Sequence, residues 1–182
     1  MRYWERFGGL FDKYRETDRG NLGGKVRKKI IAWDTAPGKE YFDELFRVSR
    51  NQIIWGGNYF NLPPTRCFLV WRKLTISENF SMAMAEYAWT SFNENAKLFE
   101  CAPQDATRFH PTQKPVSLYA WIFSRYAKTG MRILDTHLGS GSSRIAAYDA
   151  GLDFVGYEID KVYFDKQEER FAAHAAQMSL FV

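Results

Sequence analysis

Two acidic residues and a glycine-rich segment occur late in the sequence at a spacing that suits a nucleoside ligand. Asp135 directly precedes the loop 136–141, which contains Gly139 and Gly141, and Glu158 follows roughly 20 residues later. Glycine has no Cβ, so its backbone can turn tightly and approach a ligand. A carboxylate at Asp135 can meet an ammonium group, and one at Glu158 can accept hydrogen bonds from both ribose hydroxyls. This pattern predicts a nucleoside pocket.

The elements around this loop follow the order strand, helix, strand, helix. The sequence predicts strands over residues 131–135 and 154–158 and helices over residues 142–150 and 161–177, with Gly151 ending the first helix. Such alternation is typical of parallel strand pairing in an open α/β sheet. Ligands of these sheets bind beyond the carboxyl ends of the strands, where both acidic residues are expected. The first helix would also direct free N–H groups toward a ligand.

Alternative roles for the glycine loop fit the sequence less well. A G-x-G pair alone is common in tight turns that bind nothing, but the acid before the loop, the helix after it and the acid ending the next strand favour a ligand. A nucleotide oxidoreductase stays an alternative, although Arg144 stands where the third glycine of G-x-G-x-x-G belongs. A Walker loop is excluded because the G-K-[ST] sequence is absent.

The earlier part of the sequence predicts two further helices and three strands, which lie over residues 41–48 and 114–127 and over residues 52–57, 66–71 and 82–92. Pro37-Gly38 marks the start of one helix, and Pro115 is tolerated in the first turn of the other. Residues 93–109 are polar and expected to be irregular. Apolar residues at three- and four-residue steps suggest an amphipathic helix over residues 3–14, followed by a flexible loop at 17–24.

Composition favours one packed domain over residues 1–182. The chain is 46% hydrophobic and 17% aromatic, which argues against disorder. Its net charge of +4 permits a polyanionic partner without requiring one. The two cysteines and three histidines show no metal-ligand spacing, so no metal is expected. No apolar run reaches membrane-spanning length, and the first residues lack a signal core, so a cytoplasmic protein is expected.

Two segments resemble motifs of one enzyme family. Residues 135–142, Asp-Thr-His-Leu-Gly-Ser-Gly-Ser, resemble the D-x-F-x-G-x-G cofactor motif of DNA amino-methyltransferases. Residues 110–115, His-Pro-Thr-Gln-Lys-Pro, resemble the H-P-x-x-K-P box of these enzymes. The order of box, glycine loop and ribose acid is similar to that of the permuted, beta-type subgroup. Residues 55–60 and 85–92 resemble phage- or prophage-type members, and the likeness covers roughly residues 30–182.

The resemblance implies a Rossmann-like, S-adenosyl-L-methionine-dependent methyltransferase fold with a mostly parallel sheet and helices on both faces. It also implies methyl transfer to the exocyclic amino group of adenine in double-stranded DNA, as in restriction-modification systems. Because the same architecture serves amino-methylation of cytosine, that base stays an alternative. The segment 93–109 takes the place of a target-recognition region. It is short, so sequence discrimination is expected to be modest or to need a homodimer.

The resemblance and the spacing together give two sets of candidate binding residues. The cofactor-binding candidates are His110, Thr112, Lys114, Asp135, Thr136, His137, Gly139, Ser140, Gly141, Ser142, Glu158 and Asp160. The box is expected to lie beside the methionine end of the cofactor. The DNA-binding candidates are basic residues that could contact phosphate, namely Lys25, Arg27, Lys28, Lys29 and Arg66, with Arg72 and Lys73 as further ones. For each of these, a solvated surface charge is the alternative.

The catalytic motif of the family, D/N/S-P-P-Y/F/W, has no match in this sequence. It is expected upstream of about residue 30, where its oxygens would accept the two amine hydrogens and its aromatic ring would stack on the flipped base. The only Pro-Pro pair is Pro63-Pro64, but Leu62 precedes it and Thr65 follows it. This pair is expected to form a loop between two strands. The catalytic residues are therefore unknown.

Three origins of the missing motif stay open. The chain could be a truncated product that lost the catalytic strand, or a natural remnant that binds cofactor or DNA without catalysis. Alternatively, the divergent residues 1–30 could supply a substitute through Asp12, Tyr14 or Asp18. The first two origins are favoured. Loss of the motif would leave the sheet without one central strand, which another part of the chain or a second chain could replace.

Overall fold

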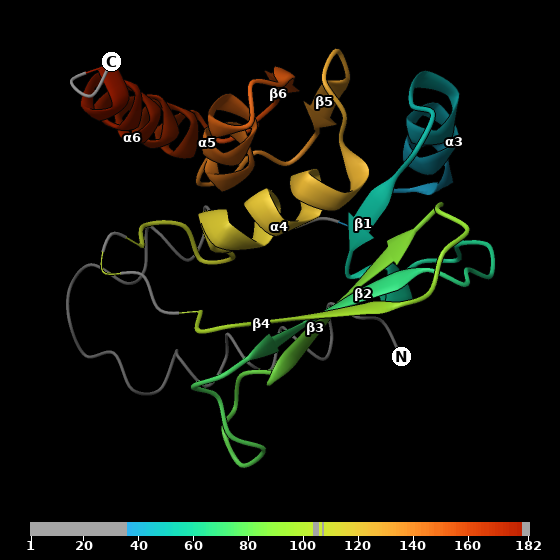
Figure 1. The fold of residues 1–182 in the computed structure, drawn as a ribbon. Coiled ribbons are helices and arrows are strands. Elements are labelled where there is room, and N and C mark those ends of the chain that lie inside the picture. Colours follow the sequence, from blue (N-terminus) through green and yellow to red (C-terminus); the bar gives the residue numbers. More distant parts are fainter. Residues whose placement is uncertain (1–35, 104–105, 107, 180–182) are drawn as a thin grey trace. The chain divides into compact units, whose positions relative to one another are not determined.

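The computed structural model describes residues 36–103, 106 and 108–179, and the chain divides into two compact units, residues 1–100 and 101–182 (Figure 1). The single domain expected from the sequence stays a prediction beside this division. The helix and the loop expected within residues 3–24 lie outside the described residues, as does the basic cluster at 25–29. No helix of the described part has the length and apolarity needed to cross a bilayer.

The first unit contains one α-helix, one short 3-10 helix and a four-stranded sheet. The elements are α3 (Lys39–Val48), β1 (Ile53–Trp55), η1 (Gly57–Tyr59), β2 (Phe68–Lys73), β3 (Ala85–Thr90) and β4 (Lys97–Cys101), whose last residue begins the second unit. The strand order is β1-β3-β2-β4. Both β1 and β2 pair with β3 in antiparallel fashion, with Leu69 of β2 opposite Ala88 of β3. The predicted helix and strands are confirmed, with ends shifted by a few residues.

Alternation of side chains along β2 explains how this unit builds its core. Leu69, Trp71 and Lys73 point to the buried face, whereas Phe68 and Arg72 are exposed on the other. Leu69 is fully buried, as is Ala88 opposite it. The helix α3 contributes an edge-to-face ring contact across to β3, which joins helix and sheet.

That ring contact involves Phe46 of α3 and Trp89 of β3, whose centroids lie 5.8 Å apart. Trp89 also donates a hydrogen bond of 2.7 Å from its indole Nε1 to the carbonyl of Pro63. This bond fixes the Pro63-Pro64 segment between η1 and β2. The sequence-based interpretation of the pair as a loop between two strands is confirmed.

Two expectations about the sheet need correction. Residues 97–101 form strand β4 next to β2, whereas the whole segment 93–109 was expected to be irregular. The strand has the period-2 pattern of an edge strand, with Leu98 and Glu100 exposed, and Glu100 forms an ion pair of 2.7 Å with Arg72. Parallel pairing also does not dominate the described residues. The connection from β2 to β3 contains no helix, and parallel strands need a long crossover, whereas antiparallel strands do not.

The second unit has the strand and helix alternation that the sequence predicts. Its elements are α4 (Val116–Tyr126), β5 (Arg132–Asp135), α5 (Ser142–Asp149), β6 (Asp153–Gly156) and α6 (Lys161–Ser179). Strands β5 and β6 pair in parallel, side by side in Figure 1, and Asp135 is the register partner of Gly156. Pro115 is the residue before α4 and does not lie in its first turn. The α/β class is confirmed.

Helix α5 is the centre of this unit's core, because it packs against α4, β6 and α6. Its residues Ile145, Ala146 and Ala147 are buried, and Leu118 and Ile122 of α4 are buried as well. Two small residues at the middle of α5 allow close approach of neighbouring elements. The loop that joins β5 to α5 is thereby held on a rigid support.

The contact between Gly57 and β3 gives a test of the first unit. A Cβ at Gly57 would lie 2.4 Å from Cβ of Trp89, so Gly57→Ala must displace η1 from the sheet. We expect the free energy of unfolding to fall by about 1–3 kcal/mol, measured by urea unfolding. Gly38→Ala is the matched control in the same unit, because its φ of −76° suits alanine and a Cβ there meets only the flexible end of the Glu40 side chain. A Gly57→Ala protein as stable as the wild type would contradict the packing described here.

Candidate functional site

The loop between β5 and α5 turns through two glycines with left-handed backbone conformation. Gly139 has φ of 55° and Gly141 has φ of 74°, a region that other residues enter only with strain. The N–H of Gly141 donates to the carbonyl of Leu138 at 2.9 Å, which closes a tight turn. Helix α5 begins directly afterwards, at Ser142. Its first N–H groups have no partner within the helix and point back over the loop.

Glu158 follows β6 and links the end of that strand to this loop. Its Oε2 accepts a hydrogen bond of 2.8 Å from the N–H of Gly139, and its Oε1 accepts one of 2.9 Å from the N–H of Asp160. Asp160 is buried, and its Oδ1 accepts the N–H of Val162 at 2.8 Å, so it caps the start of α6. Each carboxylate oxygen of Glu158 has a second lone pair that can accept a ligand hydroxyl.

Asp135 organises the opposite side of the same loop. Its Oδ1 accepts the N–H of His137 at 2.9 Å, and its Oδ2 accepts the hydroxyl of Ser143 at 2.5 Å. The carboxylate therefore ties the start of the loop to the first turn of α5. Two acids from neighbouring strand ends thus converge on one glycine loop, which is the arrangement that the sequence predicts.

The segment 110–115 packs directly against this loop. His110 is buried, and a Cβ at Gly139 would lie 3.3 Å from its Cε1. The imidazole also meets the ring of Tyr163 edge to face, with centroids 4.4 Å apart. Its Nδ1 accepts the N–H of Thr112 at 3.3 Å. A Cβ at Gly139 would therefore press on the imidazole, a contact that the sequence alone did not indicate.

Other residues of the box differ in their surroundings. Gln113 is buried, and its Oε1 accepts the N–H of Phe109 at 3.3 Å, which fixes the backbone before the box. Lys114 is half-buried, and its positive charge acts on His110. Thr112 is exposed, and so is His137, the second residue of the glycine loop. The structure brings the candidate residues together around the loop, and their ligand roles stay predictions.

The surroundings of His110 keep its imidazole neutral. Burial is the largest cause, and the charges of Lys114 and Arg108 add to it, so that the pKa of His110 falls from 6.5 to about 4. Asp160 acts in the opposite direction. At neutral pH the ring therefore adds no charge beside the loop, and its Nδ1 can accept the N–H of Thr112.

Helix α6 supports the loop through polar residues that the sequence analysis did not identify. Gln167 is fully buried beneath Gly141, where an added Cβ would lie 3.0 Å from its Oε1. Arg170 donates two hydrogen bonds of 2.9 Å from one Nη1 atom, to the carbonyl of Ser140 and to the hydroxyl of Ser142. With Tyr163, these residues recur at helical spacing on one face of α6. That spacing of polar residues was the available sequence signal.

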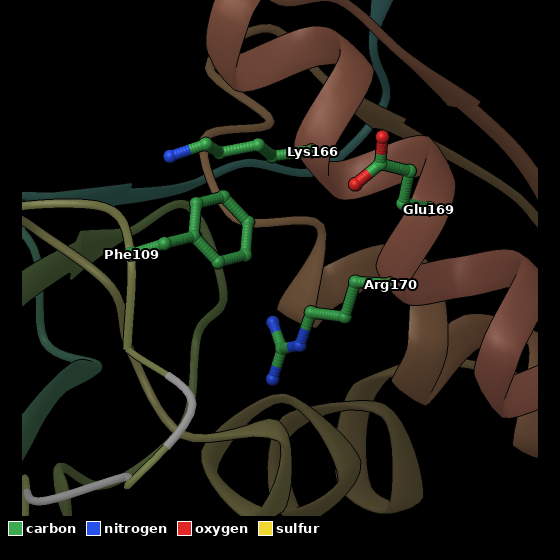
Figure 2. A pocket seen from close by; sticks show the side chains of 4 residues that line it. All are labelled: Phe109, Lys166, Glu169 and Arg170. Carbon is green, nitrogen blue, oxygen red and sulfur yellow. The ribbon is translucent and has the colours of Figure 1, made fainter.

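A hollow of about 390 Å³ lies on the same helix, lined by Phe109, Lys166, Glu169 and Arg170 (Figure 2). Figure 2 shows the side chains of Lys166 and Arg170 extending from α6 on the side of Phe109. The ammonium of Lys166 lies 5.9 Å from the centroid of the phenyl ring. Arg170 therefore belongs both to the wall of this hollow and to the support of the glycine loop.

Of the five basic residues first named for DNA contact, the structure describes Arg66. Lys25, Arg27, Lys28 and Lys29 lie outside the described residues. Arg66 donates a hydrogen bond of 2.6 Å from its guanidinium to the side-chain oxygen of Asn95. Because the side chain is exposed, a phosphate could also reach it.

Two further basic candidates have acidic partners in the first unit. Arg72 is paired with Glu100, as described above. Lys73 is buried and forms an ion pair of 2.8 Å with Glu86. The structure therefore does not place it as a phosphate contact, contrary to expectation. A buried ammonium that is already paired cannot reach a DNA backbone without breaking the pair.

Comparison with known proteins places these features in context. A sequence model of the DNA methylase family matches residues 24–169. YubD of Escherichia coli (strain K12), whose name describes it as a methylase, is 33% identical over 66 residues, which are 36% of this chain and 29% of that protein. The type II methyltransferase M2.DpnII of Streptococcus pneumoniae is 38% identical over 64 residues, which are 35% of this chain and 24% of that protein. The matched part is thus under a third of each relative.

Among solved structures, the chain resembles that of M1.HpyAVI in complex with SAM. The sequence identity is 26% and the TM-score is 0.44, and the match covers 57% of this chain and 60% of that chain.

The neutral state of His110 predicts a dependence of stability on pH. Above pH 6.5 the imidazole is neutral in the folded and the unfolded chain. Below it, the unfolded chain binds a proton that the folded chain, with a pKa of about 4, does not. The free energy of unfolding therefore falls between pH 6.5 and about pH 4, by about 3 kcal/mol from this residue.

Urea unfolding at several pH values measures this effect, with His110→Gln as the comparison. Other groups titrate in the same range, so the difference between the two proteins is the informative quantity. We expect the slope of stability against pH to be smaller in the variant between pH 6.5 and 4. Identical slopes would show that the histidine titrates as it does in the unfolded chain.

Proposed function

Because the chain belongs to the DNA methylase family, we propose that it binds S-adenosylmethionine at the glycine loop and directs methyl transfer to the exocyclic amino group of adenine in DNA. The family match covers most of the chain, and the expectation of a DNA methyltransferase is confirmed at this level. The family is one of S-adenosylmethionine-dependent methyltransferases.

The observation that carries the proposal is the convergence of Asp135, Glu158 and His110 on the loop before α5. The free N–H groups at the start of α5 suit the carboxylate of an amino-acid ligand. The unused lone pairs of Glu158 suit the two hydroxyls of a ribose. The loop, the acids and the box thus offer complementary groups to both ends of this cofactor. They fit a ligand that is an amino acid at one end and a nucleoside at the other.

When bound, S-adenosylmethionine supplies a methyl group on a positively charged sulfur. The residues of this chain would bind and orient it. Asp135 and Glu158 hold the loop and contribute negative charge to its surroundings, which favours a cationic ligand. His110 stays neutral at pH 7 and therefore adds no positive charge that would repel a cationic ligand. Methyl transfer would further require acceptors for the amine hydrogens of the base, which is the task of the D/N/S-P-P-Y/F/W motif in the family.

Adenine is our choice of target base, and it rests on likeness to the family, in which residues 55–60 and 85–92 resemble phage-type members. Cytosine amino-methylation is the alternative within the same family. Double-stranded DNA is the proposed partner, with Arg66 among the contacts, and a homodimer would extend a short recognition segment. We propose a cytoplasmic location, which is consistent with the proposed DNA substrate.

The described residues offer no match to the catalytic motif of the family. The Pro63-Pro64 loop is held to β3 through Trp89 and offers no acceptor side chain before the prolines, since Leu62 occupies that position. A chain that binds cofactor or DNA without methylating it is therefore the alternative function. Both alternatives share the cofactor site, so binding and transfer must be measured separately.

Calorimetry with S-adenosylhomocysteine tests the cofactor site. We expect the wild-type chain to bind, and Glu158→Ala to weaken binding by about 10-fold or more, because it removes the acceptor for the ribose and for the N–H of Gly139. Glu158→Gln should also bind less tightly, since its NH₂ group would face one of the two backbone N–H donors. Glu78→Ala, an exposed change in the first unit, is the control and should bind as the wild type does.

The same experiment with a nicotinamide cofactor separates the oxidoreductase alternative. Binding of that cofactor together with no affinity for S-adenosylhomocysteine would contradict the proposed function.

A filter assay with tritiated S-adenosylmethionine and mixed-sequence DNA tests transfer. An active chain gives incorporation above that of an Asp135→Ala, Glu158→Ala double variant, because the variant lacks both loop acids. Digestion of the labelled DNA to nucleosides then identifies the base, with label in N6-methyladenine expected. Binding without incorporation would replace the enzyme assignment by that of a cofactor-binding remnant.

A further inference from the structure

Arg170 reaches from the middle of α6 into the polar backbone of the glycine loop. Its Nη1 lies 2.9 Å from the carbonyl oxygen of Ser140 and 2.9 Å from the hydroxyl oxygen of Ser142. Both serines are buried, and the two hydroxyl oxygens lie 3.1 Å apart. One guanidinium nitrogen has two hydrogens, so it can satisfy both acceptors at once.

These two contacts fix the part of the loop that faces the start of α5. A peptide group is planar, so holding the Ser140 carbonyl also sets the direction of the N–H of Gly141, which closes the turn by donating to the carbonyl of Leu138. Ser142 is the first residue of α5, so its contact holds the helix end to the same support. Gly141 and Gly139 would otherwise give this segment more freedom than any other residue type. Arg170 therefore restricts a flexible turn at the point where ligand-binding N–H groups emerge.

The rest of the same helix face contacts the loop in a different way. Tyr163 packs against His110, and Gln167 fills the space beneath Gly141. These contacts are mainly steric and keep the loop at a given distance from α6. Arg170 adds directed hydrogen bonds with a charged donor, which are shorter and stronger than neutral ones. It is thus the residue of this face that sets loop orientation rather than loop spacing.

We propose that Arg170 is a positioning residue for cofactor binding, which acts by holding the Ser140 carbonyl and the Ser142 hydroxyl so that the loop is ordered before the cofactor arrives. The proposal rests on the proposed function, because it concerns the same site. Ordering the loop in the free protein lowers the entropy cost of binding, so its loss appears mainly as weaker cofactor affinity. Arg170 itself need not touch the cofactor.

The test compares Arg170→Met and Arg170→Lys with the wild-type chain in calorimetry with S-adenosylhomocysteine. The methionine variant keeps the apolar stem and loses both hydrogen bonds, and we expect its Kd to rise by about 10- to 100-fold. The lysine variant keeps charge and donors on a shorter side chain, so its Kd should lie between the two. Arg132→Met is the matched control, because it removes an exposed arginine at the start of β5 that pairs with Asp153, and it should keep the wild-type Kd.

Kinetics separates positioning of the cofactor from a general structural role. In an active chain, Arg170→Met should raise KM for S-adenosylmethionine while KM for DNA stays within about two-fold of the wild-type value, since only the cofactor loop is affected. A thermodynamic cycle with Ser142→Ala provides a second measurement. Arg170→Met should weaken binding less in the Ser142→Ala background than in the wild type, because one of its two contacts is already gone.

The outcomes separate this inference from the proposed function. Wild-type chain without affinity for S-adenosylhomocysteine overturns the proposed function and this inference with it. Wild-type binding with unchanged Kd in both Arg170 variants overturns only the role of Arg170. If Arg170→Met does not fold, Arg170→Lys decides, with a Kd raised by about 3-fold or more supporting the proposal and a wild-type Kd opposing it.

Discussion

The hydrogen bond from the N–H of Gly139 to the carboxylate of Glu158 is the contact on which the rest of the candidate site depends. It joins the loop after β5 to the end of β6, and the same carboxylate holds the N–H of Asp160 at the start of α6. The N–H of Leu138 also donates to the carbonyl of Tyr157 at 2.9 Å, so the carboxylate adds a side-chain bond to a backbone connection between the same two segments. The side chain of Glu158 therefore connects the glycine loop, the end of β6 and the start of α6.

Three supports hold the loop from different directions. Asp135 ties it to the first turn of α5, His110 packs on Gly139, and Arg170 holds Ser140 and Ser142 from α6. The glycines serve these contacts as much as they serve a ligand, because a Cβ at Gly139 would press on His110. Pre-organisation of this kind lowers the entropy that a ligand must remove on binding. The contact between His110 and Gly139 also brings the segment 110–115 against the loop, although the two lie apart in the sequence.

Local patterns predicted the second unit well and the first unit less well. Strands β5 and β6, their parallel pairing and the helices around them followed from alternation and from glycine positions, because these signals are local. The edge strand β4 was missed because Leu98 and Phe99 are surrounded by polar residues. Antiparallel pairing of β1, β2 and β3 was missed because the expected parallel sheet came from likeness to a family rather than from connection lengths.

The candidate site shows the same limit. The sequence located Asp135, Glu158 and His110, since each stands in a recognisable motif. It did not locate Gln167 and Arg170, which lie far from the loop in sequence and have the composition of an ordinary surface helix. It also assigned both acids to the ligand alone, whereas each already accepts two hydrogen bonds from the protein. Carboxylates have enough lone pairs for both tasks, so the ligand roles stay predictions that these contacts permit.

The most direct test of the central claim is an amide NMR titration of the full chain with S-adenosylhomocysteine. We expect the N–H signals of Gly139, Ser140, Gly141 and Ser142 to shift most and to saturate together, while those of β2 in the first unit stay in place. Saturation without a change at these four residues, or with the largest changes in β2, would contradict binding at the glycine loop.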